Sequence, residues 1–211
     1  MTIKVAVSQY SVPETSLEAY KKALEVALSA GKEGCELLVL PETALGSLAE
    51  VKQTSVDYLE DLKRLTKETG ITIATTFYSK LESKIYNFGY VVDPAGTVLH
   101  SHTKLYLATS EKNIDSITPG NELKISDSRL GKIGMLICKD GFNKYSNYLY
   151  ESFNNDRVDI IVIPTWSLGT FDLNTQKYIS TLFSYGAFQS RSFILVSGNL
   201  NKETKSFGQS M

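Results

Sequence analysis

Three side chains capable of covalent catalysis each follow a strand-like segment. Cys138 comes directly after the apolar run 133–137, Glu42 follows the run 37–40, and Lys104 ends the strand-like segment 97–104. Together they would supply a nucleophile, a carboxylate base and a cation. Taken singly, a cysteine after an apolar run is more often a small core residue, and the two charged residues could be solvated strand ends. Their common position at strand ends favours one shared catalytic site.

The first third of the chain alternates strand and helix. Strand-like segments at 4–9, 35–40 and 71–77 are separated by segments 16–32 and 56–69, which carry leucines at helical spacing and end at glycines. This βαβαβ order predicts a parallel sheet with helices outside it.

The middle of the chain predicts hairpins before the α/β alternation resumes. Segments 86–92 and 97–104 flank the turn Asp93-Pro94-Ala95-Gly96, and a second hairpin joins 123–126 to 132–138. The later helices and strands are expected at 145–153, 158–163, 175–190 and 193–197. Such elements predict two sheets packed face to face, with helices on both outer sides. Ligands of α/β sheets collect at the carboxyl ends of strands, where the three candidate residues fall.

The polar segment 106–121 lies between the two hairpins. It is too long for a simple turn, and loops of this length inside a compact domain are usually functional. We therefore expect it to contribute to a site.

The chain resembles the carbon-nitrogen hydrolase family, also called the nitrilase superfamily, whose members use a Glu-Lys-Cys triad. The matching residues are Glu42, Lys104 and Cys138. The resemblance continues in the strand 3–9 and in four short motifs: Thr118-Pro119-Gly120, Pro164-Thr165-Trp166, Ser197-Gly198-Asn199 and Phe207-Gly208-Gln209-Ser210. It implies a four-layer α-β-β-α sandwich with two mixed sheets, formed by a single domain over residues 1–211. Family members usually continue past the last motif, so the usual C-terminal strand and tail are expected to be lacking.

The resemblance implies a thiol hydrolase that cleaves the C–N bond of a small amide through a Cys138 thioester and releases ammonia or an amine. Glu42 would act as the general base, and Lys104 with a backbone N–H near Lys139 would stabilise the developing anion. A free cysteine has a pKa of about 8.5 and supplies little thiolate at neutral pH, so Glu42 would remove the thiol proton. Beside Glu42 and Lys104, Cys138 is expected to be prone to thiolate formation. Nitrile or N-carbamoyl substrates are alternatives. So is a non-catalytic interaction or regulatory protein on the same scaffold.

Other residues are candidates for the rest of the site. The family carries a second acidic residue after its lysine, for which Glu111 is the best match and Asp115 a rival. Trp166 could form an apolar wall of the substrate pocket, although a core role is equally compatible with the sequence. Phe142 and Tyr78 are weaker candidates for that wall, and Lys139 is a candidate for binding substrate.

Composition excludes several function classes. The 211 residues carry a formal charge of −1 without a basic stripe, which gives no reason to expect nucleic-acid binding. No apolar run reaches the ~18 residues of a membrane span, and the N-terminus lacks a signal-peptide pattern, so we expect a cytoplasmic protein without membrane contact. The two cysteines are expected to be free thiols, with Cys35 as a packing residue. With only two histidines and no Cys/His/acidic cluster, we expect no metal and no cofactor.

Two predicted helices have more aromatic residues than one buried face needs. Residues 145–153 carry aromatics around much of the helix, and the later helix carries Tyr178, Phe183, Tyr185 and Phe188. Such surfaces suit a partner helix, and the family resemblance implies association through these helices. We expect a homodimer or a larger homo-oligomer.

Overall fold

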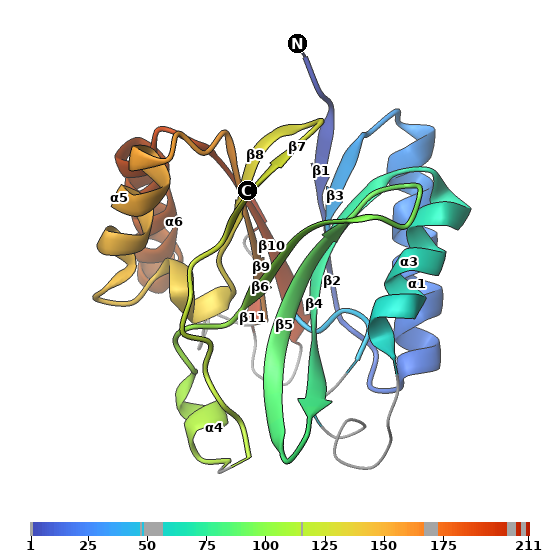
Figure 1. Cartoon of the computed structure of the whole chain (residues 1–211), viewed down its shortest axis with the longest axis horizontal. Helices are drawn as coiled ribbons and strands as arrows, with labels where there is room; N and C mark the ends of the chain where they lie inside the picture. Colours follow the sequence, from blue (N-terminus) through green and yellow to red (C-terminus); the bar gives the residue numbers. More distant parts are fainter. Residues whose placement is uncertain are drawn as a thin grey trace.

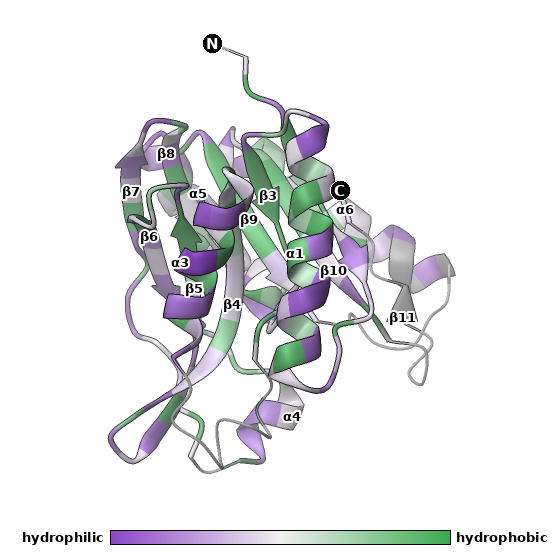
Figure 2. Cartoon of the chain, turned by 90° about the vertical axis from the view of Figure 1, so that its right-hand side faces the viewer, coloured by the Kyte–Doolittle hydropathy of each residue, from purple (hydrophilic) through white to green (hydrophobic). Residues whose placement is uncertain are grey.

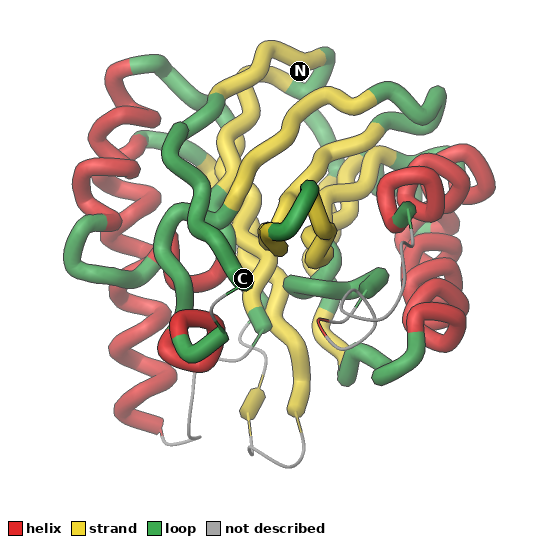
Figure 3. Tube along the Cα trace, turned by 60° about the horizontal axis from the view of Figure 1, so that its bottom comes forward, coloured by secondary structure: helices red, strands yellow, loops and turns green. Residues whose placement is uncertain are grey.

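Four layers make up the molecule: two helices, two mixed β-sheets face to face, and two further helices (Figure 1). The structure is a computed structural model that describes residues 2–46, 48, 57–114, 116–166, 173–201, 206–207 and 210–211. The expected four-layer α/β sandwich is confirmed. Figure 3 shows the helices flanking the strands on both sides.

The first sheet has the strand order β1-β3-β4-β5-β6. Its strands are β1 (Val5–Val7), β3 (Leu37–Val39), β4 (Thr72–Leu81), β5 (Lys84–Val92) and β6 (Val98–Thr103). The first three are parallel and joined by the crossover helices α1 (Ser16–Lys32) and α3 (Tyr58–Thr69), as the βαβαβ order predicts. The last three are antiparallel neighbours.

Local signals in the sequence set the ends of these helices. The side chain of Thr15 caps the start of α1, and Asp57 accepts hydrogen bonds from two backbone N–H groups at the start of α3. Gly70 ends α3 with a φ of 72°, a conformation that glycine adopts without steric cost.

The second sheet has the order β11-β10-β9-β8-β7, and β2 (Gln9–Tyr10) also pairs with β10. The other strands are β7 (Ile125–Ser128), β8 (Gly131–Met135), β9 (Ile160–Thr165), β10 (Phe193–Asn201) and β11 (Ser206–Phe207). Helices α5 (Ser146–Asn155) and α6 (Leu173–Ser190) cover its outer face (Figure 1). The segment 4–9, expected as one strand, is therefore shared between both sheets.

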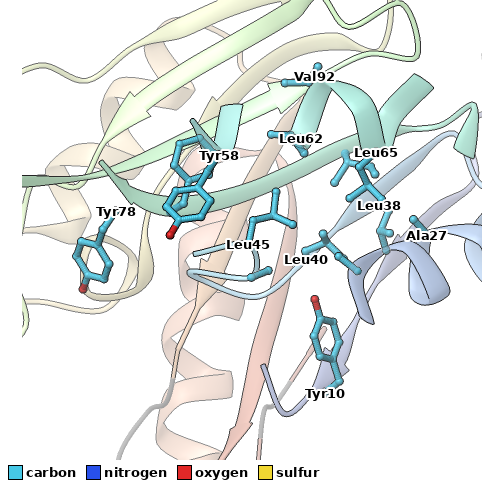
Figure 4. Close-up of a cluster of buried hydrophobic side chains, with 14 of the residues drawn as sticks. Tyr10, Ala27, Leu38, Leu40, Leu45, Tyr58, Leu62, Leu65, Tyr78 and Val92 are labelled. Atoms are coloured by element: carbon cyan, nitrogen blue, oxygen red, sulfur yellow. The ribbon is translucent and has the colours of Figure 1, made fainter. Parts of the chain in front are cut away.

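Strand alternation explains the layered core. Leu37 and Val39 are fully buried between the two sheets, whereas Leu38 and Leu40 pack against α1 and α3. Figure 4 shows this helix-side cluster, with Leu62 and Leu65 of α3 beside Leu38. Successive strand residues point to opposite faces, so an unbroken apolar run is what a strand covered on both sides requires.

Helices α1 and α3 are amphipathic, and the two sheets approach each other closely. In Figure 2, α3 is coloured mainly hydrophilic and α1 carries both hydrophilic and hydrophobic residues, while β3 and β9 behind them are mainly hydrophobic. A Cβ atom at Gly89 of β5 would collide with the side chain of Met135 in β8, so this position needs glycine. Of the described helices, none combines the length and apolarity that crossing a bilayer would require.

Candidate active site

The loop after β3 places Glu42 against the end of β9. Its backbone N–H donates to the carbonyl of Thr165 (3.2 Å), and its Oε2 accepts a hydrogen bond from the backbone N–H of Trp166 (2.8 Å). The neighbouring Thr43 adopts a φ of 56°, and its N–H donates to Thr76 Oγ1 (2.9 Å). These bonds hold the carboxylate, of which 2% is exposed, at the carboxyl ends of strands from both sheets.

Cys138 opens a 3-10 turn, η1 (Cys138–Gly141), just beyond β8, with a φ of 49°. A positive φ is uncommon for a residue with a side chain and needs support from its surroundings. Asp140 provides it, because its carboxylate accepts the N–H of Ile137 (3.0 Å) and, from the segment after Lys104, the N–H groups of Leu105 (3.0 Å) and Tyr106 (2.7 Å). The carboxylate of Asp140 thus connects the turn that begins at Cys138 to the segment that follows Lys104.

Lys104 lies just after β6 and is 2% exposed. Its Nζ contacts Glu42 Oε1 at 2.7 Å and Glu111 Oε2 at 2.8 Å. Burial by itself lowers the pKa of Lys104, but the charges of Glu42 and Glu111 outweigh it and hold that pKa well above its usual value. The ammonium is therefore charged at neutral pH, between two carboxylates.

Glu111 comes from the short helix α4 (Thr109–Lys112), inside the polar segment 106–121. Its Oε2 also accepts the N–H of Ala108 (2.6 Å), and its Oε1 accepts the hydroxyl of Tyr78 (2.7 Å). Burial raises the pKa of Glu111, but the ammonium of Lys104 and these hydrogen bonds bring it below its usual value. The rival candidate, Asp115, lies outside the described residues.

These side chains surround one cavity of about 380 Å³. Glu42, Lys104, Glu111, Cys138 and Trp166 all line it, as does Tyr78, the weaker candidate for its wall. Trp166 is 37% exposed, so it is not a core residue.

Two further candidates are placed elsewhere. Lys139 and Phe142 are not among the described residues that line the cavity. Lys139 borders a separate hollow of about 500 Å³ beside Tyr106 and Tyr145. Phe142 packs edge-on against Phe183, with the ring centroids 6.2 Å apart. Their role in binding substrate stays a prediction.

The sulfur of Cys138 is buried, which affects its protonation. Burial raises the pKa of the thiol, the charge of Glu42 raises it further, and the opposing effects of Lys104 and the Trp166 N–H are smaller. The raised pKa runs against the expectation of a thiolate-prone Cys138, whose reactivity stays a prediction.

Asn87, which sequence reasoning missed, also belongs to the site. Its Nδ2 lies 2.8 Å from Glu42 Oε1 and 3.5 Å from Glu111 Oε1. Asn87 faces Tyr78 across the β4–β5 pair, so only the sheet register brings it here. Among the described residues, no three His, Cys, Asp or Glu side chains are grouped as a metal site would require.

Comparisons with known proteins give the chain's relationships. A Schizosaccharomyces pombe protein described as a hydrolase is 28% identical over 54% of this chain and 40% of its own length. Bovine omega-amidase is 24% identical over 66% of this chain and 55% of its own length, so the chain spans about half the length of these curated relatives. The fold matches an amidase from Nesterenkonia sp. AN1 with a TM-score of 0.82 at 16% identity, covering 98% of this chain and 82% of that one. Residues 4–211 match the family model for carbon-nitrogen hydrolases, and the chain belongs to this family.

Proposed function

We propose that this protein is an amidase that hydrolyses a small non-peptide amide through a thioester on Cys138. The observation that carries the proposal is that Cys138, Glu42 and Lys104 all line one cavity, with Glu42 hydrogen-bonded to Lys104. These are the groups that nucleophilic attack on an amide carbon requires.

Each group has a distinct role in the proposed reaction. Glu42 accepts the thiol proton as the sulfur attacks the carbonyl carbon, and the same proton passes to the departing ammonia or amine. Glu42 then takes a proton from water, which attacks the thioester, releases the carboxylic acid and regenerates the thiol. Since the resting thiol has a raised pKa, proton transfer to Glu42 accompanies attack instead of preceding it.

Lys104 is suited to stabilising the tetrahedral oxyanion. An ammonium has three N–H donors, and among the described residues two of them are directed at Glu42 and Glu111. The third is available for the substrate oxygen, together with the backbone N–H near Lys139. A preorganised donor of this kind typically contributes about 10²–10³ in rate. Glu111 contacts the same ammonium as Glu42 and helps to hold it in place.

The cavity favours a small substrate. Its volume of about 380 Å³ is near the lower end for small-molecule sites. Two carboxylates face one ammonium at its base, so the reacting end of the substrate should be a neutral amide. Small aliphatic or ω-carboxy amides fit this description, with nitriles and N-carbamoyl compounds as subtypes. Bovine omega-amidase among the relatives supports this class.

Alkylation of the cysteine tests the proposal. In a solved variant of the Nesterenkonia amidase with a glutamate replaced by glutamine, the active-site cysteine carries the acetamide moiety of fluoroacetamide. For this chain we expect iodoacetamide, a small amide, to label Cys138 before Cys35 and to abolish ammonia release in step with labelling. Cys35 is the internal control, because it packs in the cluster beside α1, whereas Cys138 lines the cavity.

The outcomes separate the candidate functions. The assay measures ammonia release across small amides, nitriles and N-carbamoyl compounds, and peptide mass spectrometry locates the label. Full activity after stoichiometric labelling of Cys138 would remove the nucleophile from the mechanism. A protein that is inactive on the whole panel and labelled first at Cys35 would be a non-catalytic interaction or regulatory protein on this scaffold.

We also propose that the protein associates through α5 and α6. Tyr148 is 70% exposed, Tyr178 65% and Phe188 80%, all on the outer layer formed by these helices. Large aromatic side chains exposed together on one face commonly mark a protein–protein contact. A second copy of the chain, paired through the same helices by a two-fold axis, would cover them.

A further inference from the structure

The two carboxylates of the site share a single ammonium. Glu42 and Glu111 contact Lys104 Nζ at 2.7 and 2.8 Å. One cation offsets one of the two negative charges, and neighbouring buried carboxylates tend to take up a proton unless other donors stabilise the ionised forms. A protonated Glu42 could not accept the proton of the thiol. The site therefore needs further donors directed at these oxygens.

Asn87 supplies such donors to both carboxylates. Its side chain is fully buried, and an amide nitrogen carries two N–H groups. The Nδ2 contact to Glu42 is 2.8 Å and that to Glu111 is 3.5 Å, so Glu42 is the main partner. Among the described side chains, only Asn87 and Lys104 donate to both carboxylates. The opposite orientation of the amide would place Oδ1 against carboxylate oxygens, so the hydrogen-bond network fixes the nitrogen toward them.

The register of the first sheet brings this amide to the site. Asn87 lies opposite Tyr78 in the antiparallel β4–β5 pair, and its carbonyl accepts the backbone N–H of Lys104 at 3.0 Å. Residues directly opposite in antiparallel strands point to the same face. Tyr78, Asn87 and Lys104 therefore form one row across three adjacent chain segments. Asn87 and Lys104 donate hydrogen bonds to both carboxylates, and Tyr78 donates to Glu111.

We propose that Asn87 is a positioning residue that holds Glu42 ionised and directed at the Cys138 thiol, with Glu111 kept apart from it. The proposal rests on the amidase function proposed above. The titratable groups that face Glu42 are Lys104, Glu111, Cys138 and, through Glu111, Tyr78. None of them can replace the neutral amide, because Lys104 is already shared, the thiol must give up its proton, and the Tyr78 hydroxyl is bonded to Glu111.

Asn87→Asp tests this proposal. The substitution keeps the size of the side chain but replaces both N–H donors by an acceptor oxygen. We expect the acid limb of kcat/KM to move to higher pH by about one to two units, since a hydrogen bond to a charged group is lost. We expect kcat to fall about 10- to 100-fold through misplacement of the base, with KM little changed. Asn87→Ala, which removes the donors without adding a carboxylate, should move the limb in the same direction but less, and it decides the question if Asn87→Asp does not fold.

Thr72→Val is the matched control. Thr72 is a fully buried polar residue of the same sheet, but its hydroxyl accepts a hydrogen bond from Arg129 instead of serving the site. This variant should lose stability without moving the acid limb. An unchanged limb and kcat in folded Asn87 variants would overturn the proposal.

The pH dependence of Cys138 alkylation by iodoacetamide, followed by mass spectrometry, reports the charge of Glu42 without amide turnover. An ionised Glu42 raises the pKa of the thiol. Asn87 variants whose Glu42 takes up its proton at higher pH should therefore be alkylated faster than the unmodified protein in that pH range, and equal rates there would also overturn the proposal. Failure of the amidase proposal would look different, because the unmodified protein would then release no ammonia from any amide.

Discussion

Replacing Glu42 by glutamine should separate base catalysis from the reactivity of the thiol. Glu42 Oε1 accepts hydrogen bonds from Lys104 and Asn87, and Oε2 accepts one from the Trp166 N–H. Glutamine has a single acceptor oxygen. If this oxygen faces Lys104 and Asn87, the new NH2 group meets the Trp166 N–H and leaves it unpaired. Such a loss costs about 1–3 kcal/mol of unfolding free energy, which a folded domain can tolerate.

Glu42→Gln should lower turnover but maintain or raise the rate of Cys138 alkylation. Turnover should fall about 10²–10⁴-fold, because an amide cannot accept the thiol proton. The carboxylate of Glu42 also raises the pKa of Cys138, whereas Lys104 lowers it. Removing the carboxylate while keeping the ammonium should therefore lower the pKa of the thiol. We expect alkylation of Cys138 at neutral pH to persist or to become faster while hydrolysis is lost.

The assay combines ammonia release, the rate of iodoacetamide labelling by intact mass, and urea unfolding. Glu60→Gln is the matched control, because Glu60 forms an exposed ion pair with Lys63 on α3, away from the cavity. It should leave turnover and labelling unchanged. A Glu42→Gln protein that keeps the kcat of the unmodified enzyme would refute the assignment of Glu42 as the base.

The remaining predictions concern stability and association. Burial lowers the pKa of His100 from 6.5 to about 4, so between these pH values the unfolded chain binds a proton that the folded protein excludes, and stability falls as the pH falls. At pH 5 this amounts to about 2 kcal/mol. His100→Gln should lose less stability between pH 7 and pH 5 in urea unfolding, and equal losses would contradict this reasoning. For association, light scattering should show at least a dimer at micromolar concentration. Joint replacement of Tyr148 and Tyr178 by lysine should give a monomer, while a monomeric unmodified protein would disprove the interface.

Much of the fold could be predicted because the spacing of hydrophobic residues in the sequence indicates the strands and helices. The unbroken apolar run through Leu37 to Leu40 indicates a strand covered on both faces, and the structure buries alternate residues toward the other sheet and toward the helices. The antiparallel pairing of β4 with β5 was not foreseen, because the sequence shows no tight turn between residues 77 and 86 beyond a short polar segment. The division of residues 4–9 between two sheets depends on long-range partners, which no local pattern reports.

The part of the site that could be predicted consists of residues whose position depends only on where a strand ends. Glu42, Lys104 and Cys138 meet because carboxyl ends of strands gather at one edge. Asn87 and the role of the Tyr78 hydroxyl depend on sheet register, which shows only when strands are paired. Lys139 and Phe142 were expected beside substrate; Lys139 borders a separate hollow and Phe142 packs against Phe183, so their role stays a prediction.

The N-terminal segment passes from the first sheet to the second between β1 and β2, and this has a consequence for how the chain folds. β1 pairs with β3 in the first sheet, but Gln9 and Tyr10 pair with Gly198 and Asn199 in the second, and the Ser8 and Ser197 hydroxyls meet across 189 residues. Closing a loop of this length costs conformational entropy before the contacts that it forms can stabilise the structure. Folds rich in pairings between residues far apart in sequence therefore form slowly. On a ribosome the first strand emerges long before its partner. We expect the final docking of the two sheets to be the late and rate-limiting event, with β2 joining β10 only at that stage.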